Sequence, residues 1–318
     1  MTEGKQTLDK KYRPLTLEAL HGNEATKKSI AAVVARQQDL PASILLTGPS
    51  GCGKTTVARI IAAMVGSGGR DLKEYNISDM RGIDTARNIL DLIEVPPMWA
   101  EKRVIILNEC HRGTTDFWNA MLEVLEEPPE GNHFILCTTE PKALKRTVHT
   151  RCTPYTLRLL KAVELTNLVL GVARQEEVEL AEQTMLVSKL VEHAEGSPRS
   201  ALVLLDSIID LPAFEDMQAV MDAYTAPEET MRDLCQALLK GAPWDAVGPL
   251  LKGIKEQPED LRRGMLFYFE SVVYRGGQNA ARACDLLGYF ERPTYDTGRP
   301  GLTMACYRAA GAIPVATE

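Results

Sequence analysis

The sequence predicts an α/β domain with a parallel sheet, followed by a small helical domain and a final helical domain. Its 318 residues suit two or three domains. Up to about residue 157, short apolar runs alternate with stretches of helical periodicity. Beyond that point apolar residues recur at helical spacing with no strand pattern between them. We therefore expect domains over residues 1–157, 158–212 and 213–318, with the last break at Leu211-Pro212.

In the first domain, strands and helices are expected to alternate. An amphipathic helix is predicted over residues 24–38, after a polar start. The predicted strands are the apolar runs 43–47, 103–107 and 134–138, with 75–77 as a further candidate. The predicted helices that follow them cover residues 54–64, 84–94 and 115–127. Such alternation indicates βαβ units and a parallel sheet with helices on both faces.

The remaining chain is predicted to be helical throughout. The second domain should contain helices over 161–175, 180–194 and 197–210. In the third, helices are expected around 229–240, 243–255, 258–275 and 279–290, within a helical stretch reaching residue 311.

Composition excludes several classes of protein. Hydrophobic residues make up 45% and charged residues 25% of the chain, as in ordinary globular proteins. No apolar run approaches the ~18 residues of a membrane span, and the start lacks the apolar core of a secretory signal. A cytoplasmic protein without membrane contact is expected. The net charge of −7 disfavours a polyanion-binding surface all round, but allows a local basic channel.

The seven cysteines show no paired spacing. Cys-x-x-Cys and His-x-x-x-His do not occur, so neither a disulfide framework nor a structural zinc site is indicated. We expect buried thiols in a reducing compartment.

The strongest motif is the glycine-rich stretch 48–55, which matches Gly-x-x-x-x-Gly-Lys-[Ser/Thr]. Its backbone N–H groups can surround a phosphate, with Lys54 reaching the β and γ phosphates and the Thr55 hydroxyl binding Mg²⁺. A simple glycine turn is the alternative, but a predicted strand before it and a predicted helix after it favour the nucleotide site. The predicted cofactors are ATP and Mg²⁺, held by Gly48, Pro49, Ser50, Gly51, Cys52, Gly53, Lys54, Thr55 and Thr56.

A second motif ends the strand 103–107. Asn108 and Glu109 stand where an acidic pair would hold Mg²⁺ and polarise the attacking water. Glu109 suits the catalytic role, although it could be a solvated loop carboxylate. Asn108 can still meet the metal through its amide oxygen, but it adds no negative charge.

Further motifs follow in a fixed order. Beyond Lys11-Tyr12-Arg13-Pro14 they occupy residues 78–84, 119–129, 136–141, 150–152 and 196–202. With them the chain resembles the ATPase subunits of AAA+ sliding-clamp loaders. Residues 119–129 and 136–141 look like the bacterial tau/gamma subunit, and 78–84 looks like eukaryotic, archaeal and T-even phage small subunits. Thr150-Arg151-Cys152 is similar to the Ser-Arg-Cys motif of the family, and 196–202 to its sensor 2 motif.

This resemblance implies a AAA+ P-loop domain, a small helical lid domain and an all-helical oligomerisation collar. It also implies roles for three residues. Thr139 would be sensor 1 and read the γ-phosphate, Arg199 would be sensor 2 and act in cis, and Arg151 would be an arginine finger acting in trans. Without the family order, Thr139 could simply end a strand, and both arginines could form ordinary surface pairs.

Four more residues receive roles from the resemblance. Tyr12 and Arg13 would border the adenine, or else form an N-terminal strap packed on the core, and both interpretations stay open. Arg81, with Gly82 and the helix start that follows, would face template-strand phosphates without reading sequence. A solvated arginine in a turn is the alternative for Arg81.

The implied function is that of a clamp-loader ATPase. ATP binding would open the sliding clamp and hold primer–template DNA, and hydrolysis would release the closed clamp. Partners would be the clamp, the DNA and other loader subunits, in a ring or spiral expected to be pentameric. The stretch 65–76 lacks the cysteines of the tau/gamma zinc module, and no long C-terminal extension follows. A phage-type loader in the host cytoplasm is therefore favoured. The alternatives are an ATP-binding scaffold with poor turnover, or a AAA+ helicase or helicase loader.

Overall fold

The computed structural model describes residues 6–36 and 40–311 of the chain, and for 225–229 it describes the backbone alone. The chain forms two compact units, Met1–Met217 and Gln218–Glu318. Their boundary falls inside helix α10 (Phe214–Leu239). Division of the first unit into an ATPase domain and a lid domain, at residues 157 and 158, stays a prediction.

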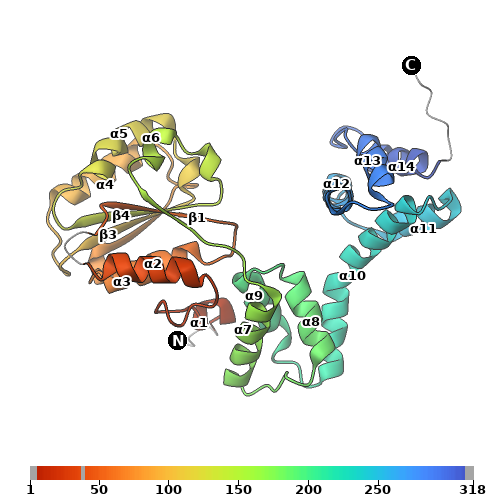
Figure 1. The fold of residues 1–318 in the computed structure, drawn as a ribbon, viewed down its shortest axis with the longest axis horizontal. Coiled ribbons are helices and arrows are strands. Elements are labelled where there is room, and N and C mark those ends of the chain that lie inside the picture. Colours follow the sequence, from red (N-terminus) through yellow and green to blue (C-terminus); the bar gives the residue numbers. More distant parts are fainter. Residues whose placement is uncertain (1–5, 37–39, 312–318) are drawn as a thin grey trace, which may run out of the picture. The chain divides into compact units, whose positions relative to one another are not determined.

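The first unit is built on a parallel sheet of five strands in the order β2-β3-β4-β1-β5 (Figure 1). The strands are β1 (Ser43–Thr47), β2 (Leu72–Asn76), β3 (Arg103–Asn108), β4 (Asn132–Thr138) and β5 (Thr153–Thr156). In this order β1 and β3 both lie beside β4, so residues that follow these strands emerge at one edge of the sheet.

Alternate residues of the strands serve two separate cores. Ile44 and Leu46 of β1 pack with α2 (Glu24–Val34) and α3 (Lys54–Met64) on one face. Leu45 between them packs with the helices of the other face, among them α4 (Ile83–Glu94) and α5 (Thr115–Glu126). Figure 1 shows these two helix layers on either side of the sheet. Burial on both faces explains why the strands are almost continuously apolar.

The expected α/β class with a parallel sheet and following helical segments is confirmed. The predicted strands and the helices between them are present, within a few residues of their expected ends. The sequence pattern missed β5, which is short and polar and contains Pro154. Pro154 is tolerated because β5 is an edge strand, bonded only to β1.

The helices also show some differences from the expectations. The first expected helix ends at Val34 rather than Gln38, which lies outside the described residues. Helix α10 begins fifteen residues earlier than the expected 229, because its first turns also carry apolar residues. The elements not named above are α1 (Leu8–Lys11), α6 (Arg146–His149), α7 (Ala162–Gln175), α8 (Thr184–His193), α9 (Pro198–Ile208), α11 (Trp244–Gly253), α12 (Pro258–Arg275), α13 (Ala280–Tyr289) and α14 (Gly298–Ala309).

The second unit is helical, with its own core. Phe269 of α12 and Phe290, which follows α13, are fully buried and stack with their ring centroids 5.9 Å apart. Arg262 is buried beside them and donates hydrogen bonds to Glu259 and to the Phe290 carbonyl. These contacts tie α12 to the end of α13.

A buried ion pair orders the loop between α4 and β3. Asp71 and Arg103 are 1% and 4% exposed, and their Oδ1 and Nη2 atoms are 3.2 Å apart. The other Asp71 oxygen accepts hydrogen bonds from the amides of residues 98–100, while Arg103 donates to the carbonyls of Leu92 and Val95. The buried charges of Asp71 and Arg103 thus fix the backbone of the loop, while the side chains of Met98 and Trp99 remain exposed.

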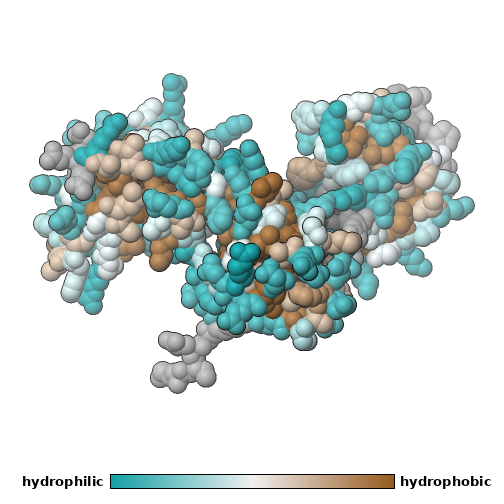
Figure 2. Space-filling model, turned by 60° about the horizontal axis from the view of Figure 1, so that its bottom comes forward, coloured by the Kyte–Doolittle hydropathy of each residue, from teal (hydrophilic) through white to brown (hydrophobic). Residues whose placement is uncertain are grey.

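Six of the seven cysteines are buried, so the prediction of buried thiols is wrong for Cys284, which lies on the exposed side of α13. Burial raises the pKa of Cys137 and Cys152 to about 12, which disfavours their reactive thiolates. The face shown in Figure 2 carries both hydrophilic residues and groups of hydrophobic ones. No helix among the described residues is long and apolar enough to cross a membrane.

Candidate nucleotide site

The glycine-rich loop lies between β1 and α3, in the strand–loop–helix context that its pattern predicts. Gly48, Gly51 and Gly53 have φ angles of 148°, 73° and 99°. A Cβ atom would lie 2.3 Å from the Leu157 carbonyl oxygen at Gly48, and 2.2 Å from the Ser197 hydroxyl at Gly51. Side chains are therefore excluded at these two positions, as the predicted close approach of this backbone to a phosphate requires.

Lys54, the first residue of α3, folds back over this loop. Its side chain is almost fully buried, and its ammonium donates to the carbonyls of Gly48 and Pro49 at 2.8 and 2.7 Å. These two bonds hold a buried positive charge at the mouth of the loop. A phosphate entering the loop would meet a cation that is already in place.

Thr55 and Asn108 meet at the base of the site. The Thr55 hydroxyl donates to the side-chain oxygen of Asn108 at 2.7 Å, across 53 residues of sequence. Both groups offer oxygen, the ligand type that Mg²⁺ prefers. The two residues predicted to hold the metal are thus neighbours, and their donor chemistry fits it.

Glu109 follows Asn108 in a left-handed backbone conformation, with φ at 49°. This conformation is uncommon for a residue other than glycine and is typical of functional turns. The turn directs the carboxylate toward the end of β4, where its Oε2 accepts a hydrogen bond from the Thr139 hydroxyl at 3.3 Å. The predicted base and the predicted sensor 1 are therefore in contact.

Sequence analysis assigned no role to His111, two residues after Glu109. Its side chain is 3% exposed, and its Nδ1 lies 3.1 Å from the Thr138 hydroxyl and 3.7 Å from Glu109 Oε2. Its Nε2 lies 3.3 Å from Glu140 Oε1. The sequence did carry one signal for this residue, a histidine close to an acidic residue at a strand end. It could not show that Thr138 and Glu140 lie beside His111, because their proximity depends on the order of the strands in the sheet.

The chain is similar in sequence and in fold to several known proteins. A family model described as "DNA polymerase III, delta subunit" matches residues 69–161. The gamma/tau subunit of DNA polymerase III from Mycobacterium bovis is 29% identical over 225 residues, which are 64% of this chain and 38% of that protein. The tau subunit from Bacillus subtilis is 26% identical over 295 residues, which are 84% of this chain and 52% of that protein.

The chain is similar in sequence to the gamma/tau subunits of DNA polymerase III. It spans between about a third and a half of the length of these curated relatives. Among solved structures, the RuvB Holliday junction branch migration motor of Thermotoga maritima matches with a TM-score of 0.58 and 19% identity. That match covers 77% of this chain and 86% of the RuvB chain, and it concerns the fold alone.

The start of α9 lies against the glycine-rich loop. Ser197 caps the helix by accepting a hydrogen bond from the Ser200 amide at 3.2 Å, and it also limits the space at Gly51. Arg199, the predicted sensor 2, has its Cβ 3.8 Å from the position of a Cβ on Gly51. Its guanidinium is 74% exposed, with Nε 4.0 Å from an Asp9 oxygen. The structure thus brings Arg199 beside the loop.

The N-terminal segment packs on the helices that follow the sheet. The Leu8 amide of α1 donates to Asp206 of α9 at 3.2 Å, and the Lys11 ammonium pairs with Glu176 at 2.5 Å. A hydrogen bond to Glu176 and then burial raise the pKa of Tyr12. Tyr12 therefore fits the strap interpretation in this structure, and the adenine contact of Tyr12 and Arg13 stays a prediction.

Arg151 and Arg81 contact other parts of the first unit. Arg151 follows α6, and its Nε is 2.8 Å from Glu126 Oε2 at the end of α5. Arg81 is exposed and precedes Gly82, the N-cap of α4. Their predicted roles, toward a neighbouring subunit and toward DNA, are not tested by a single chain.

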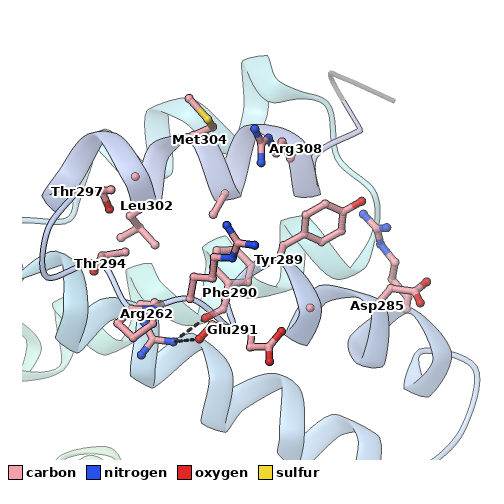
Figure 3. Close-up of a pocket in the computed structure, with 16 residues that line it drawn as sticks. Arg262, Asp285, Tyr289, Phe290, Glu291, Thr294, Thr297, Leu302, Met304 and Arg308 are labelled. Atoms are coloured by element: carbon pink, nitrogen blue, oxygen red, sulfur yellow. Dashed lines mark hydrogen bonds between the residues drawn. The ribbon is translucent and has the colours of Figure 1, made fainter. Parts of the chain in front are cut away.

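A second hollow lies in the helical second unit. This groove of about 1020 Å³ is bordered by the end of α13, the segment 291–297 and α14 (Figure 3). Arg262 and Phe290 lie at its floor, and Met304 and Arg308 come from α14 (Figure 3). It shares no residue with the P-loop or the Glu109 turn.

Proposed function

We propose that the chain is an ATPase subunit of a DNA polymerase sliding-clamp loader. The observation that carries this proposal is the convergence of four predicted residues at one edge of the sheet. Thr55 contacts Asn108, and Thr139 contacts Glu109, beside a loop in which Gly48 and Gly51 leave no room for a side chain. Similarity to the gamma/tau subunits supports the assignment to clamp loading.

The residues of the site have different roles in ATP hydrolysis. The Lys54 ammonium and the backbone N–H groups of residues 48–56, other than Pro49, bind the phosphates. Glu109 accepts a proton from the attacking water, and Thr139 orients both the carboxylate and the γ-phosphate. Arg199 approaches the phosphates in cis, and Arg151 enters the site of the next subunit. Mg²⁺, held from Thr55 and Asn108, would neutralise phosphate charge.

Assembly is part of the proposal. The first unit comprises a P-loop ATPase domain, residues 1–157, and a lid, 158–212, and residues 213–318 form the collar. The subunits form a pentameric ring or spiral that opens the clamp when ATP is bound and holds primer–template DNA inside. Clamp and DNA stimulate hydrolysis, which releases the closed clamp.

The test is ATP turnover by the assembled loader with the sliding clamp and primed DNA of the same source. We expect turnover to rise when both are present, and the clamp to copurify with the protein in a non-hydrolysable ATP analogue. Stimulation by neither would contradict the proposal.

Two alternatives make different predictions. An ATP-binding scaffold is favoured only by Asn108, which lacks the usual charge, and it would bind ATP with negligible turnover in the same assay. A helicase or helicase loader would unwind DNA or deliver a helicase. The contact between Glu109 and Thr139 favours turnover over the scaffold.

A further inference from the structure

His111 is a buried imidazole placed between two carboxylates. Glu109 lies on its Nδ1 side and Glu140 on its Nε2 side, at 3.7 and 3.3 Å. Thr138, fully buried, also faces Nδ1 at 3.1 Å. Because the His111 ring is buried on all sides, it has little freedom to rotate. The nitrogen that carries its proton therefore decides which neighbours it can hydrogen-bond.

When the His111 ring carries a single proton, the neighbours of Nε2 determine which nitrogen holds it. Glu140 Oε1 is an acceptor, so a bare Nε2 would point its lone pair at a carboxylate oxygen. With Nε2 protonated, its N–H faces a carboxylate oxygen 3.3 Å away, and the contact is attractive. Nδ1 is then the bare nitrogen.

The Thr138 hydroxyl completes this arrangement. Its oxygen already accepts the Glu140 backbone N–H at 3.0 Å, which leaves its own proton to donate. A bare Nδ1 at 3.1 Å takes that proton. Thr138 then donates to His111 and accepts from the Glu140 amide, while the Nε2–H of His111 faces the Glu140 carboxylate.

We propose that Glu140 is a positioning residue for Glu109, because it holds His111 in the tautomer that presents no hydrogen to the Glu109 carboxylate. With Nδ1 bare, His111 offers no hydrogen to Glu109, and the carboxylate is oriented by Thr139 alone among these groups. In the other tautomer an Nδ1–H would face Glu109 Oε2 and draw the base toward the ring. The proposal rests on the proposed ATPase function, because it names the control of the same catalytic base.

The test compares two variants of nearly equal size and equal charge. Glu140→Gln keeps a side-chain oxygen that can accept from Nε2–H, whereas Glu140→Leu removes the acceptor. We expect the kcat of Glu140→Gln to stay within about twofold of wild type. The kcat of Glu140→Leu should fall about tenfold, which is part of the ~10²–10⁴-fold rate enhancement that a general base contributes. KM for ATP should stay the same in both, because the base does not bind the nucleotide.

The matched control is Arg112→Gln. Arg112 is 60% exposed and lies 3.6 Å from the same Glu140 oxygen, so the variant removes an exposed ion pair and leaves the acceptor in place. Its kcat should match wild type. The proposal would be overturned if Glu140→Leu had the same kcat as wild type. It would also be overturned if Glu140→Gln or Arg112→Gln lost as much kcat as Glu140→Leu.

A second measurement does not depend on hydrolysis. Long-range ¹H–¹⁵N NMR distinguishes protonated from bare nitrogens in histidine rings. The chain has five histidines, so the signal of His111 is identified as the one that disappears in His111→Gln. Nε2–H is expected in the wild type and in Glu140→Gln, with Nδ1–H populated in Glu140→Leu. Nδ1–H in the wild type would overturn the proposal. A wild type without turnover would overturn the proposed function and the kinetic consequence, while the NMR result would still decide the tautomer.

Discussion

The hydroxyl of Thr55 and the side-chain oxygen of Asn108 are 2.7 Å apart, although 53 residues separate them in sequence. The contact joins the first turn of α3 to the last residue of β3. A carboxylate at this position would add a negative charge to the metal site. Asn108 supplies the oxygen without the charge, so the triphosphate must supply most of the attraction for the metal.

Asn108→Asp should therefore lower the Mg²⁺ concentration that gives half-maximal ATPase activity. If the added carboxylate contributes ~1.4 kcal/mol, the shift is about tenfold. The measurement is a Mg²⁺ titration at fixed ATP, and the turnover rate should also rise. If neither quantity changes, the metal is not held from this position.

Lys54→Ala should weaken ATP binding severely. The variant removes a buried ammonium that reaches the loop carbonyls and would meet the phosphates. Hydrogen bonds to charged groups contribute ~1.5–3 kcal/mol, so we expect a loss of roughly 10- to 100-fold in an equilibrium titration. Lys28→Ala, at an exposed position of α2, is the control. Undiminished affinity in Lys54→Ala would refute the P-loop assignment.

Arg151→Ala should bind ATP nearly normally and lose about 10³-fold in turnover, the usual size of an arginine-finger effect. Mixing it with Glu109→Gln should restore part of the activity, because some interfaces then combine an intact site with an intact finger. The measurement is turnover across a series of mixing ratios. Absence of recovery, with mixed assembly confirmed, would argue against action in trans.

Arg81→Ala should weaken binding to primed DNA equally for all sequences. A phosphate contact contributes no sequence information, and losing one should reduce the slope of log affinity against log salt by about 1. Fluorescence anisotropy with several DNA sequences at several salt concentrations measures both. Arg87→Ala, which removes an exposed pair with Asp84 on the same helix, is the control. A loss limited to certain sequences would indicate base readout instead.

Glu164→Gln should reduce stability at neutral pH and at mildly acidic pH. Hydrogen bonds from Arg158 and then from the Lys161 amide lower the pKa of Glu164 from 4.5 to about 2. The charged carboxylate therefore stabilises the fold fully above about pH 4.5, and this contribution disappears as the pH falls toward 2. A loss on the order of 1 kcal/mol corresponds to a Tm about 2–4 °C lower.

Thermal unfolding at pH 7 and along the range from 4.5 to 2 tests this expectation. The difference in Tm between wild type and Glu164→Gln should narrow as the pH falls. Glu94→Gln, at an exposed position on α4, should leave Tm unchanged. A constant difference at all pH values would show that the charge of Glu164 does not stabilise the fold.

The amino-acid sequence by itself determined the α/β class, the glycine loop and the predicted strands, because each depends on local patterns. Apolar runs identify strands buried on both faces, and the spacing of Gly48, Gly53 and Lys54 defines the loop without reference to distant residues. The same local patterns failed at β5, whose polar residues and Pro154 are tolerated only because it lies at the sheet edge.

The tertiary structure alone decided which polar groups meet. Strand order places the ends of β3 and β4 side by side, and this brings Thr139 to Glu109 and both Thr138 and Glu140 to His111. Such contacts depend on pairing between segments far apart in the chain, and a sequence period carries no information about that pairing. The physical reason is that the apolar pattern of a segment indicates by itself which of its residues are buried. A hydrogen bond between two side chains instead requires two separate segments to lie side by side.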